Sequence, residues 1–209
     1  MDLRNALMQI TEIRQSVARA ETFRGYRAAP VALSGVLAVA CAIVQPKWIA
    51  EPVYEIGGYL LLWLGAAFVS LAMTGLFMVL HCRHSSSPLT RTTALLAVGQ
   101  FAPCLFAGGL LTYVLYQQAP EALWMLPGLW AILFSLGVFA SYRLLPRATF
   151  WVGVYYLAAG LGCLAWARGD AAFSPWAMGV TFGVGQFLAA GILYWSLECD
   201  RDEKQEQDA

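Results

Sequence analysis

Apolar and polar residues follow each other along this chain in long blocks rather than residue by residue. Six apolar blocks of 18 residues or more carry no charge, and short polar segments separate them. A run of this length is what a helix needs to cross the hydrocarbon core of a bilayer. The pattern predicts six membrane-spanning helices, over residues 28–45, 58–80, 92–116, 122–142, 149–166 and 175–197.

Composition supports the same class of protein. Apolar residues make up 59% of the chain and charged residues 12%, whereas soluble domains have about 45–50% and 25%. The central part of every span lacks Asp, Glu, Lys, Arg and His. Ion pumps, metalloproteases and glycosidases depend on such residues. We therefore predict an all-α polytopic membrane protein that is not an enzyme and uses no cofactor.

The positive charges are distributed unevenly among the connections between the spans. Only Lys47 and Arg168 fall on one side of the predicted membrane. The other side holds Arg4, Arg14, Arg19, Arg24, Arg27, Arg83, Arg91, Arg143, Arg147, Arg201 and Lys204. Lys and Arg favour the cytoplasmic side, so both termini are expected in the cytoplasm. The formal net charge of zero gives no reason to expect a nucleic-acid partner.

The chain divides into three predicted parts. Residues 1–27 form an amphipathic helix, residues 28–197 the six-helix domain, and residues 198–209 an acidic cytoplasmic tail. No cleavable signal peptide is expected, because mostly polar residues precede the first span. The apolar arc of the first part consists of Leu3, Ala6, Leu7, Ile10, Ile13, Val17 and Ala20. Such a helix lies in the membrane interface, packs on the cytoplasmic ends of the bundle or binds a partner.

The tetrapeptide VGQF occurs twice, with Gln100 in the third span and Gln186 in the sixth. If the chain is an inverted pair of three-helix halves, the two glutamines can face each other across a transport site. In the alternative, the chain consists of three helical hairpins. The two glutamines can equally form hydrogen bonds between helices. Pro103 follows Gln100 by one turn and frees a backbone carbonyl, which makes a small polar pocket there. Gln100, Pro103 and Gln186 are the candidate ligand-binding residues.

Two further patterns have structural and functional interpretations. His81, Cys82 and His84, together with Cys199, could be ligands for a metal. In the alternative interpretation, they are the start of a solvated loop, since their spacing is not that of a known metal site. Small residues at four-residue steps predict close helix packing. They are Ser34 and Ala38; Ala66, Ser70 and Thr74; Gly179 and Gly183; and Gly185 and Ala189.

The segments 126–130, 136–141 and 182–187, with Arg14 and Leu33-Ser34-Gly35 near the first span, resemble a group of small bacterial six-helix membrane proteins. The resemblance implies a bacterial inner membrane and brings no function with it.

Two functions fit these observations. The first is a non-catalytic bundle that binds a partner protein, a lipid or an apolar ligand, and that also forms a homo-oligomer if its helices pair. The alternative is a facilitator or channel for a small neutral solute, built on the inverted repeat.

Overall fold

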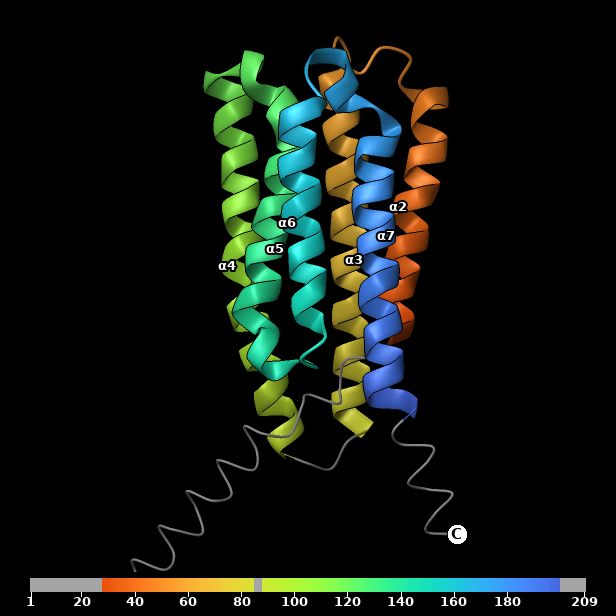
Figure 1. The fold of residues 1–209 in the computed structure, drawn as a ribbon, viewed down its shortest axis with the longest axis vertical. Helices are drawn as coiled ribbons and strands as arrows, with labels where there is room; N and C mark the ends of the chain where they lie inside the picture. Colours follow the sequence, from red (N-terminus) through yellow and green to blue (C-terminus); the bar gives the residue numbers. More distant parts are fainter. Residues whose placement is uncertain (1–27, 85–87, 200–209) are drawn as a thin grey trace, which may run out of the picture.

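The computed structural model describes residues 28–84 and 88–199, and these residues are helical with no strand. The predicted amphipathic helix and acidic tail lie outside the described residues. The long helices are α2 (Ala28–Trp48), α3 (Ile56–His84), α4 (Pro88–Gln118), α5 (Leu126–Ser141), α6 (Thr149–Trp166) and α7 (Pro175–Leu193) (Figure 1). The short ones are η1 (Pro120–Met125), η2 (Tyr142–Leu144), η3 (Gly169–Phe173) and η4 (Tyr194–Cys199).

Six spans in the described residues are long and apolar enough to cross a membrane, the fourth formed by η1 and α5 together. This confirms the predicted number of spans, and the protein is a multi-pass membrane protein. The first helix is longer than predicted, because it continues past Gln45 and Pro46 to Trp48. Gln45 lies within this helix, and its side chain is fully buried and hydrogen-bonded inside the bundle.

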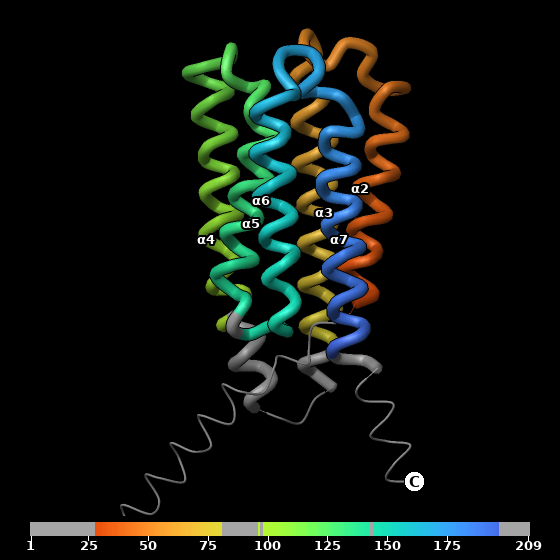
Figure 2. The backbone as a smooth tube through the Cα atoms, viewed as in Figure 1, coloured from red at the N-terminus to blue at the C-terminus, as the bar shows by residue number. Residues whose placement is uncertain are grey.

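Around the bundle the helices follow the order α3, α2, α7, α6, α5, α4. The most extensive contacts join α2 to α7 and α5 to α6, whereas α3 and α4 contact each other very little. Figure 2 shows α4 at one edge of the bundle, with α3 and α2 toward the other. We call the bundle end that carries η1 and η3 the η1/η3 end, and the opposite end the η2 end.

This order is the one that three hairpins side by side produce: α2 with α3, α4 with α5, and α6 with α7. A rotation about the bundle axis carries each hairpin onto the next and preserves the order. Two inverted halves would be related by an axis in the membrane plane, which reverses the order of helices around the bundle. The helix order therefore fits the hairpin alternative, and it places the two VGQF copies on helices that are not equivalent.

Two of the three seams between hairpins are closed by small residues. A β-carbon added at Gly179 of α7 would lie 2.5 Å from Ala42 Cβ of α2, and one at Gly160 of α6 would lie 2.7 Å from the Gly128 carbonyl of α5. Backbones this close gain van der Waals contact where lipid provides no hydrophobic drive. The predicted Ser34/Ala38 and Gly179/Gly183 stripes meet in the first of these seams, as Ser34, Ala38, Gly179 and Gly183 are all buried.

Candidate functional site

The close approach of α2 and α7 positions Gln186. A β-carbon at Gly35 would lie 3.2 Å from Gln186 Cβ, so only a very small residue fits opposite this glutamine. Beside Gly35, the buried Ser34 hydroxyl lies 3.1 Å from Gln186 Oε1 and 2.7 Å from the Val31 carbonyl, and shares its proton between them. Gln186 thus forms a hydrogen bond between two spans.

Tyr156 of α6 lies against the same part of α7. Its ring lies directly against Gly185, and its hydroxyl donates a hydrogen bond of 3.5 Å to the Phe182 carbonyl. Gln186 follows Gly185 directly in α7. An amide carries two N–H groups and two acceptor positions, and Ser34 uses one acceptor position, so donors and an acceptor remain available. Gln186 is only half-buried, and its amide can accept a further partner.

An aromatic wall adjoins this part of α7. Phe134 of α5 packs with its ring centroid 4.7 Å from Tyr156 and 5.8 Å from Phe182 of α7, and Phe101 of α4 lies 5.0 Å from Phe134. These tilted and edge-on geometries are the ones aromatic pairs favour. Four helices therefore contribute to one apolar wall with Gln186 beside it.

This wall is incompletely covered, because Phe101, Phe134 and Phe182 are all half-buried. Helices α2, α7, α6 and α5 pack consecutively, so the uncovered side is the one between α3 and α4. We call it the α3/α4 seam: residues 64–80 of α3 and 96–110 of α4. Only 11% of the residues in each of these two spans are buried, against 28–50% in the other four. Apart from the helix's own backbone and chain neighbours, no described atom lies within 4 Å of the β-carbon position at Gly65, Gly75, Gly99 and Gly109.

The η1/η3 end of the bundle is closed by a core that sequence reasoning missed. The fully buried Gln45 donates from Nε2 to the Phe173 carbonyl at 2.8 Å and accepts from Trp63 Nε1 at 2.9 Å. Tyr59 is also fully buried, its ring 5.0 Å from Phe173, and its hydroxyl has no partner among the described residues. The feature of the sequence that could have indicated this core is Gln45, a single glutamine in the apolar first span. The bundle interior is therefore packed at this end, whereas the described side chains of α3 and α4 toward the η2 end are mostly exposed.

Of the three predicted ligand residues, only Gln186 lies in this site. Gln100 and Pro103 are exposed on α4, and α4 runs through Pro103 without a break. No hydrogen bond among the described residues involves the Gln100 side chain. The neighbouring Phe101 instead packs over Gly137 of α5, so the first VGQF copy has other contacts than the second.

The predicted metal ligands cannot be placed in the same way. His81, Cys82, His84 and Cys199 fall where side chains lie outside the described part of the chain, and metal binding there stays a prediction. Among described residues, no group of three or more His, Cys, Asp or Glu gathers. Cys41, Cys104 and Cys163 are free thiols within the spans.

No protein-family model, curated protein or solved structure matches this chain. Its function is therefore inferred from its own residues.

Proposed function

We propose that the protein binds a neutral, apolar molecule with one hydrogen-bonding group, which enters from the bilayer through the α3/α4 seam. The observation that carries the proposal is the half-buried Gln186, held by Ser34 beside an uncovered aromatic wall. The wall offers apolar contact along the length of the ligand. The free donor and acceptor of the amide would pair with a carbonyl or hydroxyl group.

The depth of the site indicates the chemistry of the ligand. Gln186 lies about 16 Å along α7 from Pro175 at 1.5 Å per residue, near the middle of a hydrocarbon core about 30 Å thick. A charged headgroup at this depth would be costly without an ionisable partner, and the spans supply none. An elongated neutral molecule fits better than a phospholipid headgroup.

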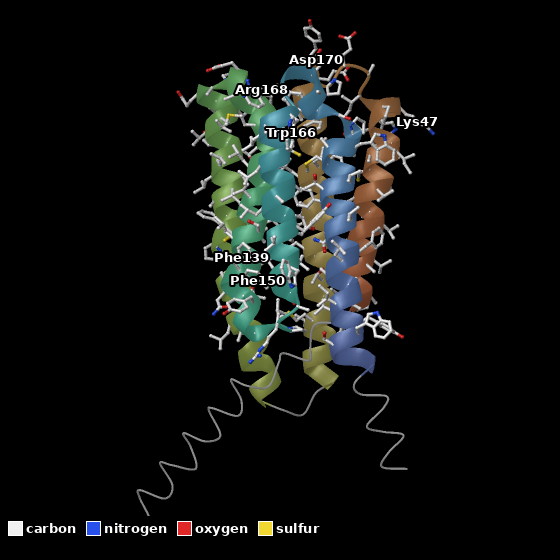
Figure 3. The ribbon with its side chains drawn as sticks, in the orientation of Figure 1. Lys47, Phe139, Phe150, Trp166, Arg168 and Asp170 are labelled. Carbon is white, nitrogen blue, oxygen red and sulfur yellow. The ribbon has the colours of Figure 1, made fainter. Side chains whose placement is uncertain are left out.

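We also propose that the membrane is a bacterial inner membrane and that the η2 end faces the cytoplasm. Arg147 lies between η2 and α6 at this end, while Lys47 and Arg168 lie at the η1/η3 end (Figure 3). In the sequence, the basic residues of the termini precede α2 and follow η4. Aromatic side chains that favour the headgroup level support a transverse orientation. Exposed ones near helix ends are Trp48, Trp166, Trp176 and Trp195. A reporter enzyme that works only outside the cytoplasm should be inactive when fused to the carboxy terminus. Activity of this fusion would contradict the proposed orientation.

The solute facilitator has less support. A path across the membrane needs an opening at both ends, and the core around Gln45, Trp63 and Tyr59 fills the bundle at the η1/η3 end. The helix order also removes the expected symmetry between Gln100 and Gln186. Partner proteins and a second copy of the chain remain the competing occupants of the seam, and each gives a distinct result in the tests.

The doubled tetrapeptide offers a matched pair of variants. We expect Gln186→Leu to weaken binding of the ligand by about 3- to 20-fold, the equivalent of one hydrogen bond between groups in a membrane. Gln100→Leu should change binding less than twofold. Solvent extracts of the purified proteins, analysed by mass spectrometry, identify the ligand, and titration of ligand-depleted protein measures its affinity.

Two results would overturn the proposal. One is equal loss in both variants, which would favour a site that needs the two glutamines together. The other is a wild-type extract that contains only the bulk phospholipids of the membrane.

A further inference from the structure

A cavity lies at the η1/η3 end, beyond the core that closes the bundle. Its volume is about 260 Å³, and three separate segments line it. Val53 lies in the turn before α3 and Ile56 begins that helix, Leu123 and Trp124 belong to η1, and Phe173 belongs to η3. The lining is therefore largely apolar, with one indole and one phenyl ring.

Two carboxylates are the charged groups of this cavity. Glu121 belongs to the first turn of η1 and Asp170 to that of η3, and both side chains are exposed. Gly169 precedes Asp170 with φ of 58°, a left-handed conformation that glycine adopts without strain. This turn places Asp170 at the tip of the bundle, as Figure 3 shows. Neither carboxylate has an ion-pair partner among the described residues.

The base of the cavity is held in place from below. Phe173 is buried, its ring meets Tyr59 edge-on, and its carbonyl accepts the hydrogen bond from Gln45. The Trp63 indole in turn fixes Gln45. A base held by ring packing and two buried hydrogen bonds does not have to be ordered when a ligand binds, which lowers the cost of binding.

We propose that this cavity binds a small organic ammonium ion with an apolar body. Trp124 and Phe173 contribute aromatic residues to the lining, and an aromatic ring offers apolar contact and attracts a cation. Glu121 and Asp170 supply the opposite charge at the rim. A divalent metal fits less well, because Ca²⁺ takes six to eight oxygen ligands and most of this lining has none to give. The proposal is independent of the ligand in the α3/α4 seam, since the packed core separates the two sites.

The test uses the purified full-length protein and two probes of similar shape, the benzylammonium ion and benzyl alcohol. Calorimetry should show saturable binding of benzylammonium and weaker or no binding of the alcohol. The double variant Glu121→Gln with Asp170→Asn should weaken benzylammonium binding by about tenfold or more, and Trp124→Leu by several-fold. Glu51→Gln, at the same end but not in the lining, should bind like the wild type.

Thermal unfolding of each variant verifies that the bundle remains folded. The proposal is wrong if benzylammonium does not bind to the wild type, if the alcohol binds equally well, or if Glu51→Gln weakens binding as much as the double variant does. The last result would indicate general charge attraction at this end.

Discussion

Replacing Gly160 with valine should destabilise the bundle by about 3 kcal/mol or more, at or above the upper end of the usual range for overpacking. A β-carbon there would lie 2.7 Å from the Gly128 carbonyl oxygen and 2.8 Å from Ile132 Cγ1. The first contact is with backbone, which cannot turn aside as a side chain can. The α5/α6 seam must separate, and the packing along its length weakens.

The matched control is Gly75→Val on α3, where nothing lies within 4 Å of the β-carbon position. This variant makes the same chemical change in a membrane-spanning helix, and we expect its stability to remain within about 1 kcal/mol of the wild type. Titration with SDS in mixed micelles measures the free energy of unfolding of both variants. Equal losses would mean that the helix substitution itself, rather than the seam, determines the cost.

The second large effect is expected at Gln45. Gln45→Leu would leave the Trp63 indole N–H and the Phe173 carbonyl without partners in a buried core. A buried group that loses its partner costs about 1–3 kcal/mol, so we expect a loss of about 2–4 kcal/mol in the free energy of unfolding. Gln117→Leu, an exposed position near the end of α4, should have little effect.

A double variant separates the hydrogen bond from the change in shape. Adding Trp63→Phe to Gln45→Leu removes the orphaned indole N–H. The loss in the free energy of unfolding of the double variant should therefore be smaller than the sum of the losses in the two single variants. Fully additive losses in the same SDS titration would show that the Gln45–Trp63 bond contributes nothing measurable.

The sequence predicts the spans well because hydrocarbon imposes a simple requirement, about 20 apolar residues in a helix. The fifth span was predicted over the same residues, 149–166, that α6 occupies. The first span is predicted three residues short of the end of α2, and the sequence alone does not show the buried hydrogen-bond partners of Gln45. Those partners, Trp63 and the Phe173 carbonyl, come from other elements.

The sequence does not reveal which helix faces pack together. Each span is apolar all around, so the periodicity that orients helices in soluble proteins is missing. The same small-residue pattern is buried at Gly179 and Gly183 but only half-buried at Ala66, Ser70 and Thr74. The two VGQF copies show the same limit. Gln100 is exposed on α4, whereas Gln186 accepts a hydrogen bond from Ser34 of α2. Because the local sequence is the same in both copies, the difference comes from the neighbouring helices.

The central claim is that the α3/α4 seam admits a neutral apolar ligand to the wall beside Gln186. A photoreactive phenylalanine derivative at position 182, activated in intact membranes, tests it most directly, and the same derivative in place of the exposed Leu161 is the control. Mass spectrometry of the adducts should show one neutral apolar compound at position 182 and bulk phospholipid at position 161. Peptides from α3 or α4, from another protein, or the same phospholipid mixture at both positions would contradict the claim.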